Sequence, residues 1–391
     1  MGLPTRGDYV TRVLFVIPGL GPGGAERSLA EEIPGLLSRG IDAHVVCFRV
    51  RPQGVHDRVE SMVPLHVLPA GRMARMRSLN NLVRRLRPHV IHTSVLPADL
   101  EGRLVGAATR TPVVSTLVNT AHDSARLADP QVARPAFEGY RLADAATARL
   151  CVSFRALTPA VRTSSAQALH LSPDRIVVIP RGRDLDALRF SEKKREDART
   201  ALGIRPDAFV VGNVARQEYQ KGLDTLVRAF HLLQRAHQDP VLVQAGRAGS
   251  HSEAIAAAAS ETGLPRGTFL QLGYRQDISH VVLPACDVFA FPSRYEGFGG
   301  AVLEAAAAGL PIVASDLPAL RDVLGDAATF VAPDDVDAWA EALAEIARSD
   351  LHPPIPEVVA RAQRFDIESI ASQVATWLHG CAEASKGMAS S

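Results

Sequence analysis

The sequence predicts an α/β protein built from two doubly wound parallel sheets. Short β-branched runs alternate with alanine- and leucine-rich stretches, and this alternation occurs in two successive series. The length of 391 residues fits two domains of ordinary size. The composition, 47% hydrophobic and 22% charged, is that of a globular protein. We therefore expect two domains whose ligand-binding loops, at the carboxyl ends of the strands, face a cleft.

The two series of expected strands are separated by a charged stretch that follows Pro180 and Gly182. This predicts one domain over 1–182, a second over 195–365, and a C-terminal helix with a frayed tail over 366–391 that can cross back to the first domain. The expected strands are 13–18, 43–48, 89–93 and 112–117 in the first series, and 209–214, 241–246, 268–273, 287–292 and 311–316 in the second.

Charge and cysteine content exclude several classes of function. Lys and Arg number 43 against 42 Asp and Glu, which gives no support to nucleic-acid binding. The N-terminus lacks an apolar signal core, and no apolar run approaches the ~20 residues of a membrane span. We expect a cytoplasmic protein with, at most, peripheral contact with the inner membrane face. The cysteines form no CxxC pair that would indicate zinc or a disulfide framework; they are Cys47, Cys151, Cys286 and Cys381.

A glycine-rich loop follows the first expected strand. Residues 19–24 match GxGxxG and precede a helix expected to begin near Ala25, so the backbone amides can approach a phosphate. A nicotinamide site would also need an acidic residue at the end of strand two, where Arg49 and Arg51 stand instead. NAD is disfavoured, whereas an NADP-dependent oxidoreductase and a ligand-free tight turn stay open.

Arg216 and Lys221 flank the loop after strand 209–214, before a helix expected from Leu223. Arginine gives bidentate contacts and lysine a mobile point charge, which suits the neutralisation of a departing diphosphate. Two solvated loop charges are the alternative. Since these cations can replace a metal ion, we expect no metal cofactor.

Two carboxylates occur in the segment RYEGFGGAVLEAAAAG. Glu296 lies in a glycine-rich turn, and Glu304 lies inside the helix that follows, whose first amides near residues 298–301 can face an anion. A carboxylate accepts two hydrogen bonds from a vicinal diol, so one acid can bind a sugar and the other a ribose. The alternative is a helix-start glutamate followed by an ordinary helical one.

This segment resembles the ExxxxxxxE signature of the retaining glycosyltransferases of family 4, which have the GT-B fold of two Rossmann-like domains. The resemblance covers nearly the whole chain. GGAER at 23–27 resembles the N-terminal loop of the family, and VIPRGRD at 178–184 resembles its domain boundary. GNVARQEYQKG at 212–222 resembles the donor loop, and LGYRQDI at 272–278 the loop that contacts the base.

The resemblance implies an acceptor-binding first domain and a second domain that binds a nucleotide-diphosphate sugar. It also implies that Arg216 and Lys221 hold the diphosphate, Glu296 orients the sugar, and transfer retains the anomeric configuration by front-face displacement. The acceptor is an unidentified hydroxyl, and no metal is required. The implied donor-binding positions are Gly23, Gly24, Gly246, Arg275, Ile278, Phe298, Gly299, Gly300 and Glu304.

The chain departs from the family pattern after strand 112–117. It reads STLVNTAHD, with Val118 where the family often has histidine. Asn119 and His122 are the acceptor-side candidates, although a loop histidine is commonly structural. Arg181 and Arg183 replace an expected Asn and Val, which allows an acceptor or phosphate contact.

Six arginines lie on an expected loop and helix of the first domain. They suit a phosphorylated acceptor, an anionic membrane surface or a solvated helix face. His89 and His92 flank a strand and are expected to be packing residues, because no partner completes a metal site. The arginines are Arg72, Arg75, Arg77, Arg84, Arg85 and Arg87.

Other functions remain open from the sequence. A nucleotide-sugar epimerase or hydrolase of the same fold keeps the donor contacts without an acceptor. A non-catalytic sugar-nucleotide-binding subunit also keeps them. The oxidoreductase alternative leaves Arg216, Lys221 and Glu296 without a role.

Overall fold

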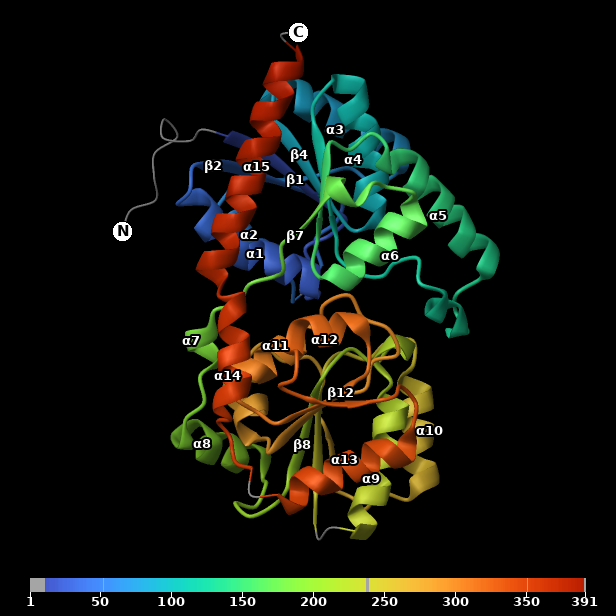
Figure 1. Ribbon diagram of the computed structural model, residues 1–391, viewed down its shortest axis with the longest axis vertical. Helices are drawn as coiled ribbons and strands as arrows, with labels where there is room; N and C mark the ends of the chain where they lie inside the picture. Colours follow the sequence, from blue (N-terminus) through green and yellow to red (C-terminus); the bar gives the residue numbers. More distant parts are fainter. Residues whose placement is uncertain (1–10, 52, 237–238, 350, 390–391) are drawn as a thin grey trace. The chain divides into compact units, whose positions relative to one another are not determined.

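The computed structural model describes residues 11–51, 53–236, 239–349 and 351–389. The chain divides into two compact units (Figure 1). The first unit contains the chain up to Arg183 together with the segment from Phe365 onward, and the second contains Asp184–Arg364. Each unit is one parallel sheet with helices on both faces, so the expected fold class is confirmed.

The first unit is built on a seven-stranded sheet in the order β3-β2-β1-β4-β5-β6-β7. All its neighbouring strands are parallel. Both faces are covered, and the central strands are accordingly continuous apolar runs. The strands are β1 (Thr11–Ile17), β2 (Ile41–Cys47), β3 (Leu65–Val67), β4 (Val90–Ser94), β5 (Val113–Leu117), β6 (Ser153–Ala156) and β7 (Ile176–Val178).

The helices of the first unit form a layer on each face of its sheet. One layer contributes Ile33, Leu36 and Leu378 to a buried cluster, and the other contributes Leu82 and Val105 to a second cluster. The first layer is α1 (Gly24–Leu37), α2 (His56–Glu60) and α15 (Ile367–Ala389), and the second is α3 (Arg72–Leu86), α4 (Leu96–Thr109), α5 (Arg134–Ala148) and α6 (Pro159–Leu169).

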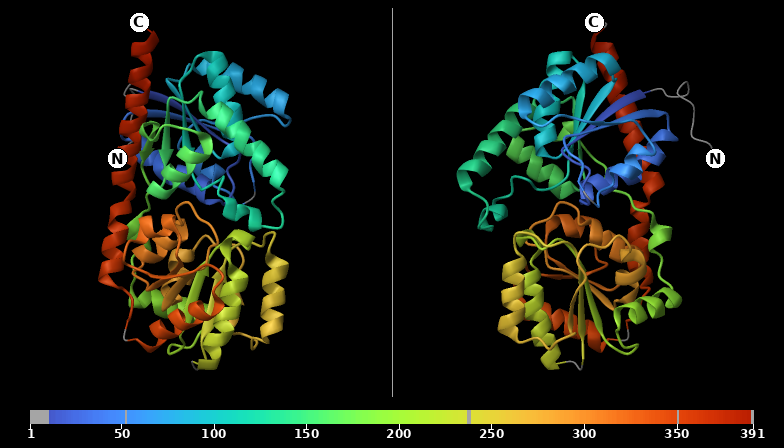
Figure 2. Two further views of the ribbon diagram at one scale, coloured as in Figure 1. Left: turned by 45° about the vertical axis from the view of Figure 1, so that its right-hand side comes forward. Right: turned by 180° about the vertical axis from the view of Figure 1, so that it is seen from behind.

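Helix α15 returns from the second unit and packs along α1 (Figure 2). Gly35 makes this close approach possible, because a Cβ there would lie 2.6 Å from the Ala371 side chain. A hydrogen bond of 2.7 Å between His379 Nδ1 and Thr11 Oγ1 ties the helix to the first strand. The C-terminal segment is therefore part of the core of the first unit.

The second unit is built on a six-stranded parallel sheet in the order β10-β9-β8-β11-β12-β13. Phe230 and Trp339 are fully buried beneath it. The strands are β8 (Val210–Val214), β9 (Val241–Ala245), β10 (Phe269–Gln271), β11 (Val288–Phe291), β12 (Ile312–Ser315) and β13 (Thr329–Val331). The helices are α7 (Leu185–Leu188), α8 (Glu192–Leu202), α9 (Leu223–Ala236), α10 (Ser252–Thr262), α11 (Gly300–Ala307), α12 (Pro318–Leu324), α13 (Val336–Arg348) and α14 (Pro356–Ala362).

The charged stretch after Gly182 folds into α7 and α8 of the second unit. Arg195 and Arg199 of α8 both pair with Asp287, which precedes β11, so these charges anchor α8 to the sheet. Across the described residues, no helix combines the length and the apolar character needed to cross a membrane.

Candidate functional site

Two loops of the second unit meet at the carboxyl edge of its sheet. One loop joins β8 to α9 and carries Arg216 and Lys221; the other joins β11 to α11 and carries Glu296. Strands β8 and β11 are parallel neighbours, so their carboxyl ends and the loops that follow lie at the same edge.

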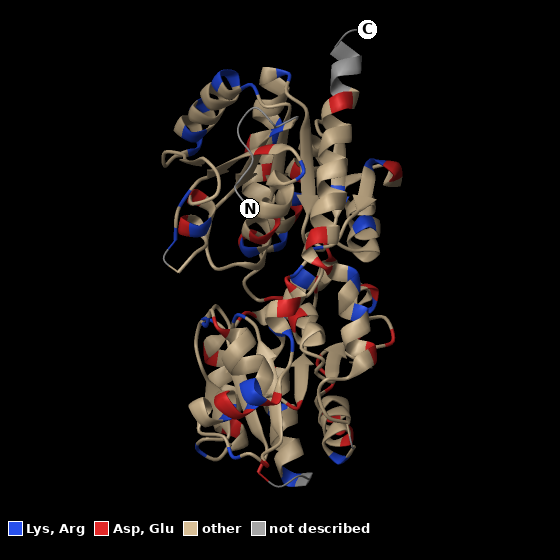
Figure 3. Ribbon diagram, turned by 90° about the vertical axis from the view of Figure 1, so that its left-hand side faces the viewer, with Lys and Arg blue, Asp and Glu red and all other residues tan. Residues whose placement is uncertain are grey.

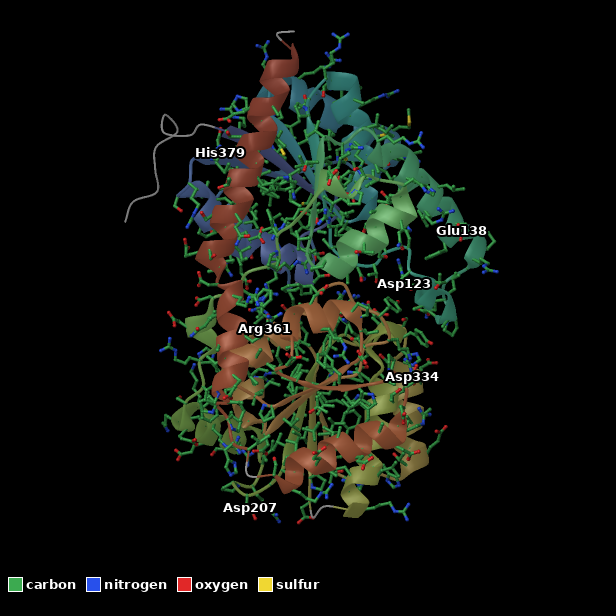
Figure 4. The ribbon with its side chains drawn as sticks, in the orientation of Figure 1. Asp123, Glu138, Asp207, Asp334, Arg361 and His379 are labelled. Carbon is green, nitrogen blue, oxygen red and sulfur yellow. The ribbon has the colours of Figure 1, made fainter. Side chains whose placement is uncertain are left out.

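Arg294 ties the two loops together. Its backbone N–H donates to Gln220 O at 2.8 Å, and its guanidinium donates to Tyr219 O at 2.7 Å. The same guanidinium pairs with Asp224 at the start of α9 at 2.8 Å, and Asp334, labelled in Figure 4, accepts from its Nε at 3.0 Å. Arg294 was not among the residues predicted from the sequence, where its position two residues before Glu296 is the only indication of a role.

Gly222 allows the loops to approach at van der Waals distance. Its φ is +59°, and a Cβ at this position would lie 2.0 Å from Pro292 O in the neighbouring loop. Only glycine satisfies both conditions without moving the backbone. This contact sets the preceding residue, Lys221, against the turn that contains Glu296.

Lys221 and Glu296 form a largely buried ion pair. The Nζ–Oε2 distance is 2.5 Å, and the side chains are 14% and 10% exposed. The other carboxylate oxygen accepts from Gly297 N at 3.0 Å. Burial acts to raise the pKa of Glu296, but the Lys221 ammonium and the backbone N–H groups of Gly297 and Phe298 outweigh it and hold the pKa below its ordinary value. The site thus presents a fixed carboxylate and a fixed ammonium.

Arg216 stands apart from this pair. Its side chain is 45% exposed, and its nearest ionic partner is Glu218 at 3.4 Å. The loop after β9 packs beside it, since a Cβ on Gly246, whose φ is +153°, would lie 1.8 Å from Ala215 O. The Arg216 guanidinium is therefore accessible to an anionic ligand.

The loop after β10 carries two further predicted residues. Gly246 N donates to Gly273 O at 2.7 Å, which joins this loop to the one after β9. Arg275 pairs with its neighbour Asp277 at 2.6 Å, whereas Ile278 is buried. The Arg275 side chain therefore has a carboxylate partner within its own loop.

Helix α11 begins directly after the Glu296 turn. Gly299 caps it with φ +79°, and Gly300 is its first residue. Phe298 and Glu304 are both buried, and the Glu304 residue is only 3% exposed. The structure places these four residues on the same turn and helix as Glu296.

The remaining predicted donor-binding residues, Gly23 and Gly24, lie in the first unit at the start of α1. A cavity of about 30 Å³ beside them is lined by Glu32, Arg155 and Arg181, among other residues. Arg155 donates to both oxygens of Glu32, at 2.9 and 2.8 Å. Burial, followed by the nearby guanidinium groups, lowers the pKa of Arg181 to about 10.

His122 is engaged inside the first unit. Its Nε2 lies 2.8 Å from Asp144 Oδ2, its side chain is 6% exposed, and Phe137 packs edge-on against its ring. Asp144 also accepts from the buried Arg103. Burial acts to raise the pKa of Asp144, but these hydrogen bonds outweigh it and lower the pKa. The geometry therefore favours the structural role for His122, while Asn119 accepts from Thr120 N at 2.8 Å.

His89 and His92 both bond within the first unit. His89 Nδ1 accepts from Arg12 N at 2.9 Å, and His92 Nε2 lies 2.7 Å from Thr116 Oγ1. Burial, with a contribution from Arg155, lowers the pKa of His92 to about 3. Within the described ranges, no group of three or more His, Cys, Asp or Glu side chains is placed to hold a metal ion.

Curated relatives match part of the chain. The D-inositol 3-phosphate glycosyltransferase of Mycobacterium marinum is 39% identical over 186 residues, which are 46% of this chain and 38% of that protein. Its namesake from Saccharomonospora viridis is 36% identical over 212 residues, 50% of this chain and 47% of that protein. The chain thus spans less than half the length of these relatives.

Solved structures match nearly the whole fold. HepE of Anabaena, in complex with UDP and glucose, gives a TM-score of 0.82 at 22% identity and covers 95% of this chain and 100% of its own. Sucrose-phosphate synthase of Thermosynechococcus elongatus gives a TM-score of 0.78 at 18% identity and covers 96% of this chain and 100% of its own.

Two family models match successive parts of the chain. Residues 22–187 match the model described as Glycosyltransferase Family 4, and residues 194–363 match the model described as Glycosyl transferases group 1. Both the sequence signature and the two-sheet architecture agree with these matches. The chain therefore belongs to the group 1, family 4 glycosyltransferases of the GT-B fold.

Proposed function

We propose that the protein transfers a sugar from a nucleotide-diphosphate sugar to an acceptor hydroxyl, with retention of the anomeric configuration. The observation that carries the proposal is the buried Lys221–Glu296 pair at the carboxyl edge of the second sheet. Family membership supports the reaction class, and the UDP and UDP-glucose complexes of HepE support the donor class.

The cations act on the leaving group. The Lys221 ammonium lies in a largely buried site, and the accessible Arg216 guanidinium adds a bidentate donor. Both stabilise the negative charge that develops on the departing diphosphate. Because protein cations supply this charge, the proposed mechanism needs no metal ion, and EDTA should leave the rate unchanged.

Glu296 acts as a positioning group. Its lowered pKa keeps it ionised, and its Gly297 hydrogen bond fixes its direction, so it can accept hydrogen bonds from donor-sugar hydroxyls. The acceptor hydroxyl then attacks the anomeric carbon on the face that the diphosphate leaves. The new C–O bond forms as the sugar–phosphate bond breaks, and the acceptor proton passes to a diphosphate oxygen.

The test combines donor binding with product analysis. Thermal-shift titration with a panel of nucleotide sugars identifies the donor, since a ligand stabilises the fold it binds. With that donor and a panel of sugar and inositol-phosphate acceptors, NMR of the anomeric proton reports the configuration of the product. A product of inverted configuration would contradict the mechanism, and rapid acceptor-free isomerisation of the donor would favour an epimerase instead.

Substitutions of Lys221 and Arg216 test their proposed roles at the diphosphate. Lys221→Gln should lower kcat by roughly 100-fold, as the loss of one preorganised donor does, and Arg216→Gln should have a smaller effect because its side chain is half exposed. Arg266→Gln is the matched control, since it removes an exposed positive charge elsewhere in the second unit. If Lys221→Gln retained the parent rate, the assigned diphosphate site would be wrong.

A further inference from the structure

The cavity of the first unit lies where the strand order of its sheet reverses. Strand β1 has β2 on one side and β4 on the other, so the crossover connections diverge between β1 and β4. Ile17, Ser94 and Val118, at or directly after the carboxyl ends of β1, β4 and β5, line the cavity. Open parallel sheets bind their ligands at this position. The fold therefore provides a ligand site within the first unit itself.

Two buried arginines near this cavity already have carboxylate partners. Arg155 of β6 is 3% exposed and donates to both carboxylate oxygens of Glu32. Arg183, after β7, is 2% exposed, and its Nη1 lies 3.2 Å from a Glu31 oxygen and donates to Ser28 Oγ at 3.2 Å. Because Ser28, Glu31 and Glu32 all belong to α1, both arginines serve to hold this helix in place.

Arg181 has different surroundings. It lines the cavity and is partly buried, yet its side chain makes no hydrogen bond or ion pair with any residue that the structure describes. A Cβ on Gly24 would lie 3.5 Å from its Nη1, so the guanidinium stands at the first turn of α1. Although burial lowers its pKa to about 10, Arg181 stays charged at neutral pH. A free cation beside the amino end of a helix favours an anionic ligand.

The described part of helix α15 supplies no counter-charge to Arg181. Val374 of this helix lines the cavity. Its acid Glu368 pairs with Arg39 at 3.0 Å, and Glu383 is exposed toward the C-terminal end. Figure 3 shows this helix, which leads to the C terminus, largely without charged segments. The partner of Arg181 must therefore come from outside the described chain.

One positive charge is left over around the start of α1. Glu26, in the first turn of the helix, acts on Arg181 through space, but no ion pair joins the two among the described residues. The amino end of the helix adds a partial positive charge. A singly charged anion therefore complements the site best. The side chains that give this balance are Arg27, Arg155, Arg181 and Arg183 against Glu26, Glu31 and Glu32.

We propose that this cavity binds the carboxylate of an acidic sugar acceptor, with Arg181 as its bidentate partner. Arg181 then selects the acceptor of the proposed transferase, on whose function this role rests. The guanidinium fork matches the two oxygens of a carboxylate, and the cavity of about 30 Å³ has room for roughly two water-sized spheres. A phosphate monoester fits less well, because it brings close to two negative charges and three free oxygens, while Arg155 and Arg183 are already paired.

Binding of sugar acids to the full chain tests the proposal without a transfer step. Calorimetry compares methyl glucuronide and methyl galacturonide with the neutral methyl glucoside and methyl galactoside, and glucose 6-phosphate is the phosphate probe. At least one acid should bind about 10- to 100-fold more tightly than its neutral counterpart, as expected for a charge-assisted bidentate pair. Equal binding of acid and neutral sugar, no binding of either acid, or tighter binding of glucose 6-phosphate would overturn the proposal.

Substitutions of Arg181 assign the preference to this side chain. Arg181→Gln should abolish the preference for the acid, and Arg181→Lys, which keeps the charge without the fork, should retain part of it. Arg149→Gln is the matched control, since it removes an exposed charge elsewhere in the first unit. Arg181→Gln should also keep the parent melting temperature, because it leaves no described group unpaired. A less stable variant that still prefers the acid would show a structural role instead.

Titration with the nucleotide sugar separates this proposal from the proposed function. Arg181→Gln and the parent should show the same thermal shift with the donor, because the diphosphate is assigned to Arg216 and Lys221. A shift that Arg181→Gln loses would assign the guanidinium to the donor and overturn the carboxylate site, with the transferase function intact. Acid binding that depends on Arg181, without transfer from any nucleotide sugar, would refute the transferase function and leave the carboxylate site standing.

Discussion

Replacing Glu296 by glutamine removes the charge that faces Lys221 while nearly preserving the shape of the side chain. The ammonium then stays in a site where it is only 14% exposed and has lost its counter-ion at 2.5 Å. Breaking a buried pair of this kind costs about 3–5 kcal/mol, and the residual exposure puts the expected loss of stability at about 3 kcal/mol. For a unit the size of Asp184–Arg364, this corresponds to a melting temperature roughly 6–12 °C lower.

Urea unfolding at several pH values is the assay. Because the folded pKa of Glu296 lies below its ordinary value of 4.5, its stabilisation is fully present above that value and is lost as pH falls through the folded pKa. The difference between parent and Glu296→Gln should therefore be constant at neutral pH and should shrink in acid. Glu341→Gln, exposed on α13, is the control.

A double-mutant cycle separates the pair from other effects of the substitution. Lys221→Met and Glu296→Gln together should cost less than the sum of the single changes, with a coupling energy above about 1 kcal/mol. A coupling near zero, or a Glu296→Gln variant as stable as the parent at pH 7, would refute the reasoning.

Two further predictions concern stability. Gly222→Ala adds a methyl group 2.0 Å from a backbone oxygen of the next loop, so it should destabilise the second unit by roughly 2–5 kcal/mol. Gly203→Ala, with φ +66° but open space around the Cβ, should cost only about 1 kcal/mol, and equal losses in urea unfolding would contradict this account. Glu32→Gln breaks the buried pair with Arg155 and should cost about 3–5 kcal/mol, whereas the exposed Glu60→Gln should be neutral; calorimetry distinguishes them.

Much of the fold could be predicted from local patterns. Strands such as β1 and β8 are buried on both faces, so their apolar runs are visible without knowledge of their neighbours. Strands β3 and β13 have only three residues each, and β6 contains the buried Arg155, so none of them shows a clear pattern. Arg155 is tolerated there because Glu32, far away in the sequence, supplies its partner.

The candidate site could be predicted only in outline. Arg216, Lys221 and Glu296 were expected at one sheet edge, and the structure places all three in neighbouring loops. Their pairing could not be predicted, because it depends on Arg294, which joins the loops through backbone oxygens that any residue could offer. The burial of His122 likewise depends on α5, a helix that the histidine does not belong to.

The sequence by itself determined the two-sheet α/β architecture and the family, because strand and helix periodicity and short loop motifs are properties of neighbouring residues. Only the tertiary structure decided that Lys221 is buried against Glu296 while Arg216 stays accessible. These outcomes follow from the order of strands in each sheet and the packing of helices, which bring together residues that no local pattern connects.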